Sequence, residues 1–185
     1  MELVQWFEKG LTKEDYMSGM KVNKDGMDTI YNGFTLNNQE KKQLEGVKDK
    51  GLKVIALSED WCGDAMLNNP ILLTIAEEAN IEVRFLLRDQ NLELMDQYLT
   101  NGTARSIPIY IFMDQNGEEK AVWGPRAEKI QELVMRERSQ LPDQERPEFK
   151  EKQIQLYKQL GARYQQDEEI WHTVAESILS VLPKE

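Results

Sequence analysis

The sequence predicts an α/β fold in which a central mixed sheet is flanked by helices, with extra helices at its N- and C-terminal ends. Short apolar segments rich in β-branched and aromatic residues occur at 52–57, 81–87 and 109–113, as expected of buried strands. Segments with apolar residues at three- and four-residue spacing alternate with them, which is typical of helices with one buried face. We expect a single domain over residues 1–185.

The N-terminal part, residues 1–51, is predicted to be a helical cover and a first helix. Up to residue 36 the chain mixes short helical patterns with glycines and turn residues, and four aromatic side chains are expected to pack onto the rest of the protein: Trp6, Phe7, Tyr31 and Phe34. Residues 37–49 begin with Asn37, which suits a helix N-cap, and continue as a polar helix toward Gly51.

The first half of the central region, residues 52–138, predicts two parallel strands joined by a helix. A strand at 52–57 is followed by a helical pattern from Cys62 to Ala79, inside which Pro70 is expected to produce a bend. The next strand covers 81–87, and a short helix over 91–102 ends at Gly102.

The second half of this region predicts a hairpin followed by a helix. The Asn116-Gly117 dipeptide is a strong turn signal between a strand at 109–113 and an antiparallel edge strand at 118–123. Residues 125–139 read as a helix that carries Pro125 in its first turn.

The C-terminal extension, residues 139–185, is predicted to be helical after an acidic, proline-containing connector. Two helices are expected, or one long helix interrupted near Gly161. Their apolar face either packs on the rest of the chain or forms a dimer or partner surface, and the oligomeric state stays open.

Composition limits the classes of function. The formal net charge of −10 disfavours attraction to nucleic-acid phosphates or anionic lipids, so we expect no nucleic acid and no membrane as partner. The N-terminal segment lacks the basic start and apolar run of a secretion signal, and a single cysteine excludes an intramolecular disulfide, which together predict a cytoplasmic protein. With one cysteine and one histidine far apart, neither a metal cluster nor a cofactor is expected.

Residues 52–138 resemble the thioredoxin family. The motif of that family, Trp-Cys-Gly-Pro-Cys at a strand-to-helix junction, corresponds to Trp-Cys-Gly-Asp-Ala at 61–65. Pro70 follows Cys62 by eight residues (70 − 62 = 8), as the helical proline of the family does. Ile107-Pro108 matches the cis-proline site, and Gly124 matches a glycine after the hairpin.

The resemblance implies a site built around Cys62 as the nucleophile. The residues expected to bind substrate are Trp61, Gly63, Asp64, Ile107 and Pro108. A cis peptide before Pro108 would present the backbone of Ile107 to an extended thiol substrate, whereas an edge-strand proline is the alternative. Trp61 is either a lid over the sulfur or a packing residue.

Two departures from the family pattern restrict this chemistry. The second, resolving cysteine of the family is Ala65 here, so a dithiol cycle cannot run within the chain. The buried acid that the family places six residues before its first cysteine is Ala56. The two losses are consistent with each other, because without a resolving thiol there is no second sulfur for the acid to deprotonate.

The charge around Cys62 has opposing effects on its pKa. Unpaired N–H groups at a helix N-terminus stabilise a thiolate, whereas the carboxylates of Glu59, Asp60 and Asp64 oppose ionisation. Asp64 also suits a helix-capping role. We expect a modest net lowering of the thiol pKa.

Two functions remain open. The first is a thiol-disulfide oxidoreductase that acts through one nucleophilic cysteine and exchanges with a low-molecular-weight thiol or a protein partner. The second is a catalytically inactive, thioredoxin-shaped binding or chaperone-like module. Arg105 is either a ligand for a substrate carboxylate or an exposed surface residue, and His172 is expected to be structural or exposed rather than a base for Cys62.

Overall fold

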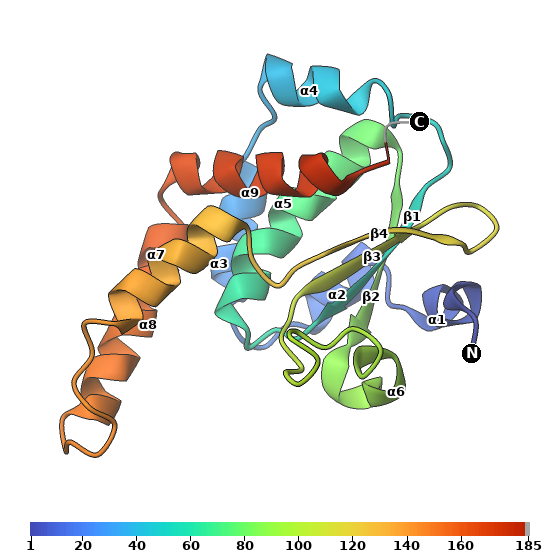
Figure 1. Cartoon of the computed structure of the whole chain (residues 1–185). Coiled ribbons are helices and arrows are strands. Elements are labelled where there is room, and N and C mark those ends of the chain that lie inside the picture. Colours follow the sequence, from blue (N-terminus) through green and yellow to red (C-terminus); the bar gives the residue numbers. More distant parts are fainter. Residues whose placement is uncertain (184–185) are drawn as a thin grey trace.

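The computed structural model describes residues 1–183, and its centre is a four-stranded mixed sheet (Figure 1). The strand order is β2-β1-β3-β4. Strand β1 pairs in parallel with β2 and antiparallel with β3, and β4 pairs antiparallel with β3 at the edge, as predicted. The strands are β1 (Lys53–Ser58), β2 (Glu82–Leu87), β3 (Ile109–Met113) and β4 (Glu119–Trp123).

The central strand β1 is buried on both faces because its side chains alternate between two apolar clusters. Val54 and Ala56 belong to the cluster under the long helix α5 (Gly63–Ala79), whereas Ile55 and Leu57 face the opposite cluster. That second cluster also contains Cys62 and side chains from α1 (Leu3–Lys9) and the short helix α6 (Leu92–Met95). This arrangement explains why residues 52–57 are continuously apolar.

The N-terminal cover is helical, as expected. It comprises α1, α2 (Lys13–Gly19), α3 (Lys24–Gly33) and α4 (Asn38–Leu44), and α3 lies along α5. Asn37 caps α4, since its side chain accepts a hydrogen bond from Glu40 N at 2.9 Å. The helix ends at Leu44 rather than near residue 49, and residues 45–49 form turns.

Two predicted helices are shorter than expected. Helix α6 takes up only the start of the helix predicted at 91–102, and the segment continues in turns; the 3₁₀ turn η1 (Arg88–Gln90) precedes it. Helix α7 (Glu128–Arg138) begins after Pro125, which follows a cis peptide bond with Gly124 instead of lying in the first helical turn.

The C-terminal extension folds as two helices, α8 (Phe149–Tyr164) and α9 (Glu168–Val181). The prediction of two helices is confirmed, but the break follows Tyr164 rather than Gly161: α8 continues through Gly161, because the buried Leu156, Leu160 and Tyr164 keep one helical face in contact with the core. The apolar face of α9 is buried within this chain against α5 and its neighbours.

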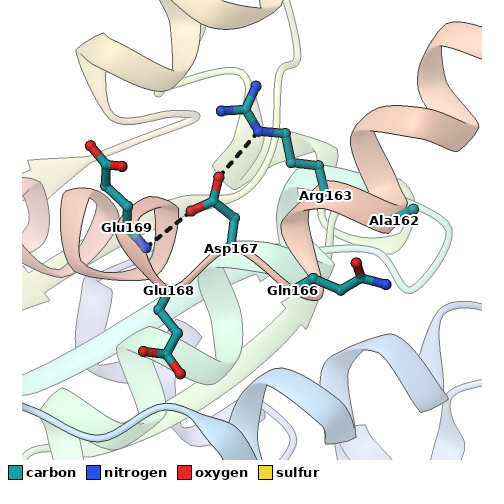
Figure 2. Close-up of a pocket in the computed structure, with 6 residues that line it drawn as sticks. All are labelled: Ala162, Arg163, Gln166, Asp167, Glu168 and Glu169. Carbon is teal, nitrogen blue, oxygen red and sulfur yellow. Dashed lines mark hydrogen bonds and ion pairs between the residues drawn. The ribbon is translucent and has the colours of Figure 1, made fainter.

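The real break between α8 and α9 is made by Asp167. Its carboxylate accepts a hydrogen bond from Glu169 N at 3.1 Å and pairs with Arg163 Nε at 3.2 Å (Figure 2). The turn lines a surface hollow of about 670 Å³. Asp167 is the N-cap of α9, so helix capping explains the position of its carboxylate and of Arg163, which pairs with it.

Candidate functional site

Cys62 lies at the junction of β1 and α5 and is the N-cap residue of that helix. The side chain is almost buried, with 9% of the residue exposed. The backbone N–H groups of Asp64 and Ala65 act on the sulfur and favour its ionised form. The strand-to-helix position predicted for the thiol is therefore the one observed.

A cis peptide bond between Ile107 and Pro108 faces this sulfur. The predicted cis form is confirmed, and the Cys62 thiol donates to the Ile107 carbonyl oxygen at 3.5 Å. Gly124 lies behind this bond with φ +129°, and a Cβ at that position would overlap the Pro108 carbonyl oxygen. The Ile107–Pro108 backbone therefore lies close to the thiol on one side and to Gly124, from a separate loop, on the other.

The thiol is harder to ionise than a free cysteine. Burial, followed by the charge of Asp64, raises the pKa of Cys62 from its ordinary value of 9.0 to about 11. Three groups lower the pKa: the N–H groups of Ala65 and Asp64, and the positive charge of Arg126. Their combined effect is smaller than the increase caused by burial and by the Asp64 charge. The expected modest lowering is wrong because the loss of hydration outweighs the helix N-terminus.

Two of the three nearby carboxylates hold neighbouring loops in place. Glu59 accepts a hydrogen bond from Asp89 N at 2.9 Å. Asp60 Oδ2 accepts from Lys21 N at 2.7 Å and from Val22 N at 3.2 Å, which fixes the segment before α3. These carboxylates therefore have a structural role that explains their place beside the motif.

The third carboxylate, Asp64, forms an ion pair instead of capping α5. Its Oδ2 lies 2.8 Å from Arg126 Nη2, and no side-chain cap is present at this helix N-terminus. The predicted capping role is wrong because the guanidinium group of Arg126 reaches the first turn from the loop before α7. Burial of Tyr164 on α8 raises the pKa of its hydroxyl group, and the charge of Asp64 adds to this increase.

Two surface hollows meet at Cys62. The first, of about 400 Å³, is called the arginine groove here, and its lining residues are Trp61, Cys62, Asp64, Arg88, Arg105, Ser106, Ile107, Pro125 and Arg126. The second, of about 350 Å³, is called the α8 pocket, and it is lined by Trp61, Cys62, Gly63, Asp64, Arg126, Val134, Tyr157, Leu160, Gly161 and Tyr164. Of the predicted site residues, only Pro108 lines neither hollow.

Trp61 is exposed and lies against a charged partner. The residue is 47% exposed, and the Arg88 guanidinium carbon lies 4.9 Å from the centre of its ring. This distance falls within the range of cation–π interactions. Trp61 forms a wall shared by both hollows.

Sequence reasoning missed Arg88, Arg126 and the wall contributed by α8. Arg88 directly follows the β2 strand, and Arg126 follows the cis Gly124–Pro125 bond. The position of Arg88 directly after the strand next to β1 was the signal available in the sequence, because the carboxyl ends of parallel neighbouring strands meet at one edge of a sheet. Arg105 is exposed and makes an ion pair with Asp96, at 2.7 Å.

A neutral hydrogen-bond network lies behind the motif, where the resemblance pointed to a missing acid. Ala56 is fully buried and lies opposite Tyr110 in the sheet. Tyr110 donates to Asn69 Oδ1 at 2.7 Å, and Asn69 Nδ2 donates to Ser58 Oγ at 2.9 Å. Tyr16 and Ser58 join through their hydroxyl groups at 2.9 Å. The interior beside β1 is therefore polar but uncharged.

His172 takes part in a separate structural contact. Its Nδ1 lies 2.7 Å from Oε1 of the buried Glu40, which joins α9 to α4. Among residues 1–183 no group of three or more histidine, cysteine or acidic side chains is arranged to hold a metal ion. No helix in this part of the chain combines the length and apolar character needed to cross a bilayer.

A family model described as thioredoxin matches residues 10–150, more than half of the chain. The chain belongs to the thioredoxin family. Membership suggests a redox-type function, and the chain contains a single cysteine. Helix α8, which walls one side of the thiol, lies almost entirely beyond the matched thioredoxin region.

Two solved structures share the arrangement of nearly the whole chain. A protein of unknown function from Pseudomonas aeruginosa has a TM-score of 0.67 at 13% identity and covers 98% of this chain and 99% of its own. An HIV epitope scaffold has a TM-score of 0.68 at 12% identity, with coverage of 98% and 97%. A thioredoxin from Fasciola hepatica is 25% identical over 51% of this chain and 88% of its own, with a TM-score of 0.35. No curated protein sequence matches significantly.

Proposed function

We propose that this protein catalyses thiol–disulfide exchange through Cys62 alone. The Cys62 thiol loses its proton to solvent, and the thiolate attacks one sulfur of a disulfide substrate. A bond forms between Sγ and that sulfur, the substrate S–S bond breaks, and the second substrate sulfur leaves as a thiolate. The thiolate of a second thiol from outside the chain then attacks the substrate sulfur of the mixed disulfide, the bond to Cys62 Sγ breaks, and Cys62 leaves as a thiolate while a new disulfide forms between the two outside sulfurs.

The observation that carries the proposal is the position of the sulfur. It lies at the N-terminus of α5, beside the backbone of the cis Ile107–Pro108 bond, and borders both hollows. The N–H groups of Asp64 and Ala65 supply stabilisation for negative charge on sulfur. A thiol that served only as apolar filling would not require a groove on each side.

The resolving thiol must come from another molecule. The chain contains one cysteine, and the residue at the position of the second family cysteine is the buried Ala65. This supports a partner that is itself a thiol or disulfide, either of low molecular weight or part of a protein.

A second candidate is a binding module that uses the same groove without turnover. The burial of Cys62 and the rise of its pKa to about 11 favour this candidate, because little thiolate exists at neutral pH. The module would hold an extended chain along Trp61 and Ile107.

Mixed-disulfide formation at Cys62, compared between native and denatured protein, separates the two functions. Cys62→Ser serves as the blank. Formation of a mixed disulfide by the native protein at pH 8, followed by its release with added thiol, would support exchange. A thiol that reacts when denatured but forms no mixed disulfide in the native state would overturn exchange and leave the binding module.

A further inference from the structure

We infer that the α8 pocket binds an aromatic side chain of a polypeptide substrate, two residues away from the substrate cysteine that Cys62 attacks. The inference rests on the proposed function and names its substrate class, a protein disulfide in an extended segment. Its basis is the lining of the pocket, its position beside the thiol, and the exposed face of α8 that continues from it.

The pocket brings together two exposed aromatic side chains. Trp61 is 47% exposed, Tyr157 is 44% exposed, and both line the pocket. Every other tryptophan, tyrosine and phenylalanine of residues 1–183 is buried or half-buried. Val134 of α7 and Leu160 of α8 complete an apolar wall. Exposed aromatic groups gathered around one hollow are typical of a surface that another molecule covers.

The charged groups of the pocket neutralise each other. Among the described residues that line it, only Asp64 and Arg126 are ionised, and they form an ion pair at 2.8 Å. Gly161 leaves open space, since a Cβ at its position would meet no atom within 4 Å. The volume of about 350 Å³ lies near the lower end of the range for ligand sites, which suits one large side chain. A neutral aromatic group therefore fits the pocket better than an ion does.

An exposed face of α8 continues from the pocket along the part of the helix that projects away from the sheet (Figure 1). This face follows the i, i+4, i+7, i+11 spacing and contains Lys150, Ile154, Tyr157 and Gly161. Ile154 is 60% exposed. At about 1.5 Å per residue the face is about 16 Å long, which is the length of about five residues of extended chain. A small thiol would leave most of it uncovered, so the occupant is a polypeptide segment.

The charge of α8 favours an acidic segment. The helix has one acidic side chain, Glu151, and four basic ones, whereas the whole chain has a formal net charge of −10; the basic residues are Lys150, Lys152, Lys158 and Arg163. Opposite charge attracts an acidic partner to this face. In a two-fold dimer through α8 the basic side chains of the two copies would oppose each other, which disfavours a second copy of this chain.

Cys62 connects the pocket to the cis peptide bond. The thiol lines the pocket and donates to the Ile107 carbonyl oxygen at 3.5 Å. In an extended segment, side chains two residues apart point to the same side and lie about 7 Å from each other. A segment whose cysteine sulfur meets Cys62 therefore places the side chain two residues away in the α8 pocket.

The test uses acidic peptides whose one cysteine is joined by a disulfide to 2-mercaptoethanol. Two peptides carry phenylalanine, either two residues before or two residues after the cysteine, and a third has alanine at both positions. Attack by the Cys62 thiolate on the peptide sulfur links the peptide to Sγ and releases 2-mercaptoethanol as a thiolate, and intact mass measures this product. Each rate is divided by the rate for denatured protein. We expect this ratio to be about tenfold higher for one phenylalanine peptide than for the alanine peptide.

Two pairs of variants locate the effect. Tyr157→Ala removes one wall and Gly161→Leu fills the open space, so both are expected to reduce the preference for phenylalanine severalfold. Leucine is a better helix former than glycine, so Gly161→Leu is expected to fold. The controls are Met135→Ala, at an exposed apolar position on α7, and Ala162→Leu, at the next position of α8. Both lie outside the pocket lining and are expected to keep the preference.

Equal ratios for the three peptides, or equal losses in the variants and their controls, would overturn the inference while exchange itself stands. So would a mixed disulfide of 2-phenylethanethiol and 2-mercaptoethanol that reacts as fast as the preferred peptide, because the occupant would then be a small aromatic thiol. A dimer of the natural protein that Gly161→Leu dissociates in sedimentation analysis would also overturn it. Absence of reaction with every peptide in the native state alone would instead overturn the proposed function.

Discussion

Asp64 Oδ2 lies 2.8 Å from Arg126 Nη2, and this ion pair borders the only thiol of the chain. The two partners act on Cys62 in opposite directions, since Asp64 raises the pKa of the thiol and Arg126 lowers it. Both side chains are largely buried, at 15% and 21% exposure, so their effect on the sulfur is weakly screened. The pair is therefore a means of adjusting the reactivity of Cys62.

Replacing Asp64 by asparagine should lower the pKa of Cys62 below about 11. Burial remains, but the second largest cause of the high pKa is removed and the charge of Arg126 is no longer balanced. Alkylation at pH 8 is expected to become severalfold faster, measured as a pH–rate profile. Asp143→Asn, at an exposed position, is the control. An unchanged profile in Asp64→Asn would contradict the role assigned to the pair.

The raised pKa of Cys62 predicts a loss of stability at alkaline pH. The unfolded thiol ionises near 9.0 and the folded one near 11, so the unfolded state releases its proton first as pH rises. The stability that the folded protein gains from keeping this thiol neutral is fully present below about pH 9 and is lost as pH rises through 11. Denaturant unfolding at pH 8 and pH 10.5 measures it.

Cys62→Ala is the comparison in that experiment, because tyrosines and lysines also titrate in this range. The stability of the natural protein relative to the variant should decrease between the two pH values. A difference that stays constant would mean that the folded thiol titrates like the unfolded one.

Asn69→Ala should destabilise the fold through the buried network. Asn69 is fully buried and bonds both Tyr110 and Ser58, so alanine leaves two buried hydroxyl groups with fewer partners. We expect a loss of about 1–3 kcal/mol in the free energy of unfolding. Chemical denaturation of Asn38→Ala, at an exposed position, supplies the control. A loss no larger than that of the control would show that the network adds little stability.

Gly124→Ala should disturb the backbone beside the thiol. The added Cβ would overlap the Pro108 carbonyl oxygen, and φ of +129° disfavours a side chain. We expect the free energy of unfolding to decrease by about 1–3 kcal/mol. Alanine at Gly19, where a Cβ meets nothing within 4 Å, is the matched control. Similar unfolding curves for the two variants would argue against a tight fit at Gly124.

Much of the fold was predictable from local patterns. The apolar run at 52–57, the helical spacing after Cys62 and the Asn116-Gly117 turn each encode an element through interactions between near neighbours, and β1, α5 and the hairpin match them. Element ends were less predictable: α8 passes through Gly161 because its buried face is held by other helices. Propensity alone does not include that contact.

The candidate site was predictable in its residues but not in its electrostatics. The sequence by itself determined that a single cysteine follows β1 at a helix N-terminus, without a second cysteine in the motif and with alanine in place of the family's buried acid. Only the tertiary structure decided that Cys62 is buried, that Asp64 pairs with Arg126, and that three arginines line one groove. The physical reason is that burial and charge at a sulfur depend on groups distant in sequence, which only folding brings within a few ångströms.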